Sequence, residues 1–105
     1  MSMSDDVEQE GVIFINRFTL AGSPEEFEAA FAQTSDYLRQ QPGLLEFTLL
    51  QSSSRDVYVN VARWQDAASL HKAVRHPRFA KHAEALRLVS TSQPDLFTAR
   101  QTYSR

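Results

Sequence analysis

The stretch that decides the fold is VYVNVARW, residues 57–64. β-Branched and aromatic residues fill most of it, which is typical of a β-strand. Because side chains on a strand alternate between two faces, Asn60 and Trp64 point one way while Val59 points the other. An asparagine in the middle of a strand is costly to bury without hydrogen-bond partners. The amide and the indole therefore share one face, and a ligand pocket is one explanation of the amide.

The residues before this strand predict its partner. Residues 44–51 (LLEFTLLQ) are strand-like, and the polar residues 52–56 fit a hairpin loop, so the two strands are expected to pair antiparallel. Strict alternation would place the apolar side chains of the first strand on both faces: Leu45, Phe47 and Leu49 on one, Leu44 and Leu50 on the other.

An earlier strand is predicted at residues 12–20 (VIFINRFTL), where both faces are largely apolar. Asn16 falls between Phe14 and Phe18 on one of these faces. Residues 1–10 lack apolar periodicity and are expected to form a disordered tail, which leaves residues 11–105 as a single domain.

The first helix has a clear start and stop. Ser23, Pro24 and Glu26 match a capping box with proline in the first turn, and residues 41–43 (QPG) end the helix. Apolar side chains at helical spacing form one stripe that is expected to pack on the sheet: Phe27, Ala30, Phe31, Thr34 and Leu38.

A second helical region follows the strand at 57–64. Asp66 can cap a helix over residues 67–75, with Leu70 on its apolar side, and the His76-Pro77 pair breaks it. A further helix is expected to resume at Arg78, and residues 96–103 (LFTARQTY) predict a fourth strand.

The predicted order β-α-β-β-α-β is that of the ferredoxin-like α+β fold, a split βαβ antiparallel sheet with helices on one face. The other face is too apolar to face water, and the sequence predicts no helix to cover it. A second copy packing sheet to sheet is the economical solution, so we expect a homodimer.

The composition of the chain argues against two classes of binding partner. The formal net charge is -2, which gives no basic patch for nucleic acid. No apolar run reaches the length of a membrane span, and the N-terminal residues are acidic and polar, unlike a signal peptide. With no cysteine in the chain, a reducing compartment is compatible, and we expect a cytoplasmic protein. Nucleic acid and membrane are both excluded as expected partners.

The histidines do not predict a metal site. His71, His76 and His82 are spaced by five and six residues, which on a helix point to different sides, unlike the four-residue spacing of a helical zinc pair. No thiolate or clustered carboxylate accompanies them. We expect no bound metal.

Four pieces, in this order and spacing, resemble the antibiotic biosynthesis monooxygenase family, whose members are dimeric α+β barrels of ferredoxin-like subunits. The pieces are residues 15–18 (INRF), 41–44 (QPGL), 58–64 (YVNVARW) and 76–79 (HPRF), and the resemblance spans about Val12 to Tyr103. It implies a cavity between the sheet and the helices of each subunit.

One branch of this family contains polyketide oxygenases that convert phenolic anthrones to quinones with dioxygen and without metal or flavin. The resemblance implies that Asn60 and Trp64 line the cavity as catalytic residues, holding an enolate-like oxygen and an oxygenated intermediate, and we add Asn16 to them. No cofactor is expected. The substrate, a small aromatic compound, is expected to contact six further residues: Phe14, Phe18, Phe31, Tyr58, Leu70 and His82.

The sequence departs from this branch at residues 67–70 (AASL), where the polyketide oxygenases are expected to have a tyrosine. Proton transfer would then fall to a histidine, with His71, His76 and His82 as the candidates.

Two alternatives stay open. The haem-degrading branch of the same family is similar at Asn16-Arg17 and would use His82 as the axial ligand, although the spacing from Phe79 is one residue short and no second tryptophan precedes it. The other alternative is a dimeric module that captures a small metabolite without catalysis.

Overall fold

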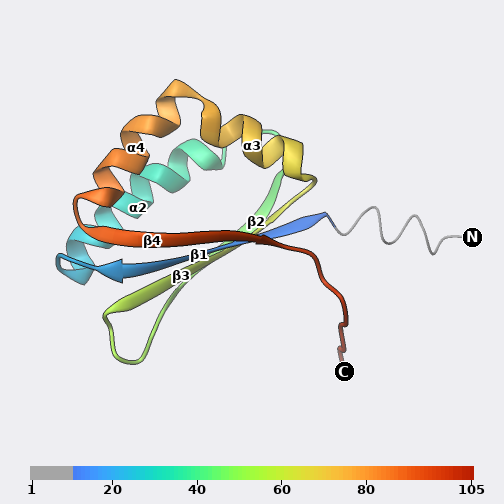
Figure 1. Cartoon of the computed structure of the whole chain (residues 1–105), viewed down its shortest axis with the longest axis horizontal. Coiled ribbons are helices and arrows are strands. Elements are labelled where there is room, and N and C mark those ends of the chain that lie inside the picture. The colour runs from blue at the N-terminus through green and yellow to red at the C-terminus, as the bar shows by residue number, and fades with distance from the viewer. Residues whose placement is uncertain (1–10) are drawn as a thin grey trace, which may run out of the picture.

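The computed structural model describes residues 11–105. The predicted tail at residues 1–10 lies outside this range. Figure 1 shows the sheet as one layer with all the helices above it. The elements in chain order are β1 (Val12–Leu20), α2 (Pro24–Leu38), β2 (Leu44–Gln51), β3 (Val57–Trp64), α3 (Ala67–Arg75), α4 (Pro77–Arg87) and β4 (Ser90–Phe97).

The sheet confirms the predicted fold class. Its strand order is β2-β3-β1-β4, and all three neighbouring pairs are antiparallel. This is the ferredoxin-like arrangement, in which β1 and β3 lie at the centre and the two βα crossovers leave β2 and β4 at the edges. β1 and β3 pair in register, with Asn16 opposite Asn60 and Phe18 opposite Tyr58.

The fourth strand was placed wrongly by sequence. β4 is Ser90–Phe97 rather than residues 96–103, and it pairs with β1 alone. As an edge strand it buries only Ser90 fully, so it carries polar residues and tolerates Pro94, whose missing N–H would break a central strand. Hydrophobic alternation cannot reveal such a strand. Residues 98–105 form no regular structure and are exposed.

A bulge changes the predicted faces of β2. The pairing with β3 shifts between Leu44 and Glu46, so that Leu44 pairs with Trp64 and Phe47 with Ala62. Leu44 therefore lies on the same face as Phe47, under the helices, and not on the opposite face as strict alternation predicted. The extra residue is Leu45, which is left exposed at the sheet edge.

The helix caps follow the sequence. The backbone N–H of Glu26 donates to Ser23 Oγ, and the Glu26 carboxylate accepts from the backbone N–H of Ser23, which completes the capping box of α2. The Asp66 carboxylate caps α3 through the Ser69 N–H at 2.7 Å. α4 begins at Pro77, one residue earlier than expected, because His76 Nδ1 accepts from the Arg78 N–H and caps it.

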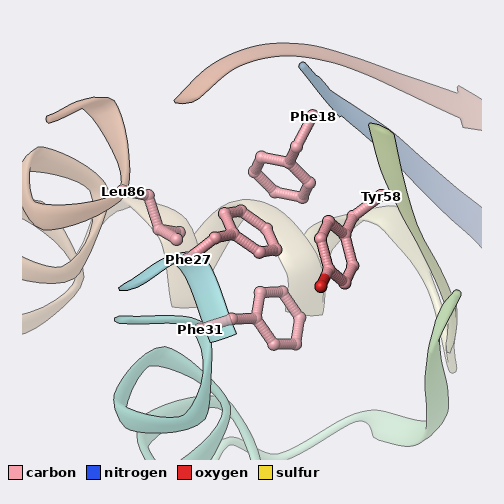
Figure 2. Packing of buried hydrophobic residues seen from close by; sticks show 5 residues of the cluster. All are labelled: Phe18, Phe27, Phe31, Tyr58 and Leu86. Atoms are coloured by element: carbon pink, nitrogen blue, oxygen red, sulfur yellow. The ribbon is translucent and has the colours of Figure 1, made fainter. Parts of the chain in front are cut away.

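The core between sheet and helices has two parts. Figure 2 shows the first, an aromatic cluster in which Phe27 and Phe31 of α2 meet Phe18 and Tyr58 of the sheet, with Leu86 of α4 beside them. The Phe27 and Tyr58 ring centroids are 4.7 Å apart. The second part lies at the other end of β3 and consists of buried Ala62, Trp64, Leu70 and Ala73. The two clusters leave a space between them.

The face of the sheet turned away from the helices carries half-buried aliphatic side chains. Ile15 lies opposite Val61, and Val59 lies opposite Leu50. In Figure 1 no helix of residues 11–105 covers this face. None of the helices in this range is long and apolar enough to span a bilayer.

Candidate functional site

The space between the two core clusters is a cavity with two adjoining chambers. The inner chamber has a volume of about 70 Å³ and lies between the middle of the sheet and helices α2 and α3. The outer chamber has a volume of about 290 Å³ and extends between α4 and β4. Six residues line both chambers and form the passage between them: Phe14, Asn16, Phe18, Val74, Phe79 and Leu86.

Seven of the nine residues selected from sequence surround the inner chamber. They come from four elements: β1 and β3 provide side chains on the helix-covered face of the sheet, and α2 and α3 provide the side chains that lie over them. The seven are Phe14, Asn16, Phe18, Phe31, Asn60, Trp64 and Leu70. The alternation along β3 is as predicted, since Tyr58, Asn60, Ala62 and Trp64 are all buried while the residues between them are half-buried.

Asn16 and Asn60 lie directly opposite each other on neighbouring strands. Side chains in such a pair have Cβ atoms about 5 Å apart, so the two amides reach the same part of the chamber. Asn60 is 5 % exposed. The Oδ1 atoms of both amides are buried and have no hydrogen-bond partner within residues 11–105.

Trp64 provides a third polar atom without a partner. Its side chain is 1 % exposed, and its Nε1 finds no acceptor. The other polar side chains of the inner chamber are occupied, because Thr34 and Ser35 donate to carbonyls of their own helix α2. A buried polar group without a partner costs about 1–3 kcal/mol, so three around one cavity mark it as a place where a ligand or ordered water would bind.

Tyr58 does not line either chamber. Its hydroxyl donates to the Glu28 carboxylate of α2, and its ring packs in the aromatic cluster of Figure 2. Burial, followed by the hydrogen bond and negative charge of Glu28, raises the pKa of Tyr58 to about 12. The phenol is therefore held in its neutral form.

His82 also lies outside both chambers. Its ring packs against Tyr37 with centroids 5.7 Å apart, and the Arg78 guanidinium lies 5.3 Å from the centre of the same Tyr37 ring. His71 is exposed and His76 caps α4, so none of the three histidines lines the cavity. The proton-transfer role considered for them gains no support from their positions.

Sequence reasoning named Phe14, Asn16 and Phe18 but missed the other residues that line the outer chamber.

Three of the missed residues, Phe79, Ala83 and Leu86, lie on α4, where apolar side chains at helical spacing could have singled them out. Arg87, the last residue of α4, carried no such signal. Ser92 and Pro94 carried none because their strand, β4, was placed too late in the chain.

The electrostatics of the two chambers differ. The inner chamber is lined by no ionisable side chain, whereas Arg87 lines the outer one. Within residues 11–105, Arg87 forms neither of the two side-chain ion pairs. An acidic group on a ligand would find its counter-charge at this arginine.

The lining residues do not fit haem. Neither chamber presents an imidazole, thioether or phenolate to an iron atom, and the expected ligand His82 packs on Tyr37 instead. The described residues contain no cluster of histidine and carboxylate side chains suited to a metal ion.

A ferredoxin-like sheet that encloses an apolar cavity edged by unpartnered amide and indole groups defines a small-molecule-binding α+β domain. Residues 12–85 match the profile of the antibiotic biosynthesis monooxygenase family, and the chain belongs to that family. The expected family is thus confirmed.

Two relatives come from Streptomyces nogalater. Deoxynogalonate monooxygenase is 46 % identical over 101 residues, which cover 95 % of this chain and 86 % of the relative. The crystal structure of SnoaB, a cofactor-independent oxygenase, is 47 % identical and superposes with a TM-score of 0.85 over 90 % of this chain and 97 % of SnoaB.

A more distant structure shares the fold. The monooxygenase from the gene ActVA-Orf6 of Streptomyces coelicolor, in complex with nanaomycin D, is 21 % identical with a TM-score of 0.78. The match covers 92 % of this chain and 94 % of that one.

Proposed function

We propose that the protein is a cofactor-independent monooxygenase that oxidises a phenolic, fused-ring substrate of polyketide type with dioxygen. The observation that carries the proposal is the set of three buried atoms without partners, Asn16 Oδ1, Asn60 Oδ1 and Trp64 Nε1, around one apolar cavity. The identity to SnoaB, a cofactor-independent oxygenase, supports the same chemistry here.

The chemistry must come largely from the substrate, because the described residues that line the inner chamber include no ionisable side chain, and its two hydroxyls, of Thr34 and Ser35, donate to carbonyls of α2. An anthrone is acidic at the carbon between its rings, so solvent water can take its proton and later return it to the peroxide. The anthrone anion is electron-rich enough to give one electron to dioxygen. Recombination of the two radicals forms a carbon–oxygen bond, and loss of water from the resulting peroxide leaves a carbonyl. One anthrone and one dioxygen thus give one quinone and one water, with one oxygen atom in each product.

The protein contributes orientation and a dry environment. We assign Asn60 to the substrate through both ends of its amide, because Oδ1 can accept from a phenol hydroxyl while the amide N–H donates to the oxygen of the substrate anion. We assign Trp64 to the oxygenated intermediate through its indole N–H. Asn16 lines both chambers and completes the polar set at the passage between them. The aromatic side chains of Phe14, Phe18 and Phe79, which line both chambers, would pack on the fused rings.

The charge of the outer chamber favours an acidic substrate. Its single charged lining residue, Arg87, would pair with an acidic group on the substrate and stabilise its anion. The relative that is 46 % identical is named for deoxynogalonate, and we propose a substrate of that class.

We also propose a homodimer. On the sheet face opposite the helices, Ile15 of β1 lies beside Val59 and Val61 of β3, and Arg17 and Arg63 share this face. A second copy packing on the aliphatic patch would remove it from water. Phe97 and Tyr103 near the C-terminus are exposed as well and would gain cover in such an assembly. A cytoplasmic location stays a prediction.

The proposed function is tested by oxygen uptake. Purified protein, treated with a chelator and free of added flavin or haem, is expected to consume dioxygen with phenolic anthrones that carry a carboxylate. Matched anthrones lacking the phenol are expected to react more slowly. Tight binding of the anthrone without oxygen uptake would instead indicate the non-catalytic module, and a haemin-dependent activity would indicate the haem-degrading branch.

A further inference from the structure

The two chambers differ in volume enough to suit ligands of different size. A fused aromatic system needs a pocket of roughly 300–1,000 Å³. The outer chamber, at about 290 Å³ and widened by the shared passage, approaches this range, whereas the inner chamber has only about 70 Å³. A water molecule needs about 10–15 Å³ of such space, so the inner chamber exceeds the need of a diatomic molecule but cannot hold a ring system.

The lining of the inner chamber suits a small apolar molecule. Away from the passage most of its lining is apolar: Phe31, Leu38, Leu44, Phe47, Ala62 and Leu70. The hydroxyls of Thr34 and Ser35 are bonded to their own helix, and Asn60 and Trp64 offer the remaining polar atoms. Apolar cavities take up apolar guests, as shown by xenon or benzene in cavities of about 150 Å³. Dioxygen is apolar and small enough to enter.

Two of the three unpartnered groups belong to the inner chamber alone. Asn60 and Trp64 do not line the outer chamber, whereas Asn16 lines both. An indole N–H interacts weakly with neutral dioxygen and strongly with a dioxygen that has gained an electron. Its effect is therefore larger after electron transfer than before, which is how a binding site accelerates a reaction.

We infer that the inner chamber is a dioxygen site, separate from the aromatic-substrate site in the outer chamber, with Ala62 and Leu70 forming its walls. This inference rests on the proposed function. The substrate carbon that reacts would lie at the passage beside Asn16, between the ring system and the gas. Dioxygen would approach it from the side of Trp64.

A matched pair of substitutions tests the division. Ala62 lines only the inner chamber and Ala83 only the outer one, so Ala62→Val and Ala83→Val each add two methyl groups to a single chamber. Ala62→Val is expected to raise KM for dioxygen about tenfold and to change KM for the anthrone less than about twofold. Ala83→Val is expected to do the reverse.

A second variant tests the same chamber in case Ala62→Val does not fold. Leu70→Phe narrows the inner chamber from α3, the opposite wall, and is expected to raise KM for dioxygen in the same direction. An Ala62→Val enzyme that binds dioxygen normally but loses affinity for the anthrone would overturn the inference, because the ring system would then occupy the inner chamber.

Xenon provides a readout that does not need turnover. Crystals of the wild-type protein under xenon pressure are expected to hold xenon in the inner chamber, and crystals of Ala62→Val are expected to lack it. If no anthrone is oxidised but xenon occupies the chamber, the proposed reaction fails while the gas site stands. Xenon bound elsewhere, with an empty inner chamber, would refute the site whatever the activity.

Discussion

At the residue scale, Asn60 lowers the stability of the ligand-free protein and is assigned to substrate binding. Its amide is buried opposite Asn16 with an unpartnered oxygen, an arrangement that lowers the stability of the ligand-free protein. A phenol hydroxyl of the bound substrate would supply the donor that this oxygen lacks. Stability and activity should therefore respond to its removal in opposite directions.

Asn60→Ala is expected to lower kcat for anthrone oxidation about 100-fold, because one donor to the developing anion is lost. The same change removes an unpartnered buried group, so thermal unfolding of the free protein is expected at the same or a higher temperature. Leu49→Ala is the control, since Leu49 is the cross-strand neighbour of Asn60 and lines neither chamber. It should lower stability and leave kcat near the wild-type value; an unstable but active Asn60→Ala would contradict the assignment.

Tyr58 makes stability depend on alkaline pH. Its pKa is raised from 10.0 to about 12 in the folded protein, so folding favours the neutral phenol. Its contribution is complete below about pH 10 and is lost as the pH rises through about 12. Burial also raises the pKa of Tyr37, which acts in the same direction.

The measurement is urea unfolding of the wild type and Tyr58→Phe at about pH 8 and about pH 11. The wild type is expected to lose more stability between the two pH values than the variant does. Equal losses would show that the Tyr58 proton is not held by burial and Glu28.

At the element scale, the junction of α3 and α4 is held by a hydrogen bond from a tyrosine of α2. Pro77 has no N–H, so the carbonyl of Ala73, four residues earlier, lacks its usual helical donor. The Tyr37 hydroxyl of α2 donates to that carbonyl at 2.7 Å. This bond joins the first helix to the segment that carries Val74 and Phe79 into the cavity wall.

Tyr37→Phe is expected to lower the free energy of unfolding by about 2 kcal/mol, because a buried carbonyl loses its only side-chain donor. Tyr103→Phe is the matched control, since Tyr103 is 78 % exposed and should leave stability unchanged. Chemical denaturation of the three proteins checks the expectation. Equal stability of all three would mean that the Ala73 carbonyl has another partner.

The elements also show where sequence patterns are informative. Three strands and the capped starts of α2 and α3 could be predicted, because burial and capping impose residue types at fixed spacing. The edge strand β4 could not, since it buries little and its polar composition resembles a loop. The bulge at Leu45 was also hidden, because both registers bury leucine.

The site was predictable to the same extent. Asn60, Trp64 and Asn16 stand out as polar groups on apolar strand faces, and all three reach the cavity. Arg87 could not be found, because it is an exposed residue at the end of α4 and no apolar spacing singles it out. His82 lies outside both chambers, and its tilted contact with the Tyr37 ring could not be read from sequence spacing.

At the scale of the whole molecule, the uncovered face of the sheet predicts assembly. Sedimentation at micromolar concentration is expected to give a mass near twice 11.9 kDa. Val59→Lys places a charge in the middle of that face and should shift the protein towards monomer. The control Gln40→Lys lies on an exposed position beyond α2 and should remain dimeric. A wild-type protein that sediments as a monomer would contradict the proposed dimer.

The central claim is that this cavity lets a substrate anion react directly with dioxygen. The most direct measurement is turnover of a phenolic anthrone under ¹⁸O₂ by protein that has been treated with a chelator and contains no flavin or haem. The account predicts a quinone that carries one ¹⁸O atom, with the other in water, and loss of this labelling in Asn60→Ala. A quinone whose new oxygen comes from water, or labelling that requires an added cofactor, would contradict it.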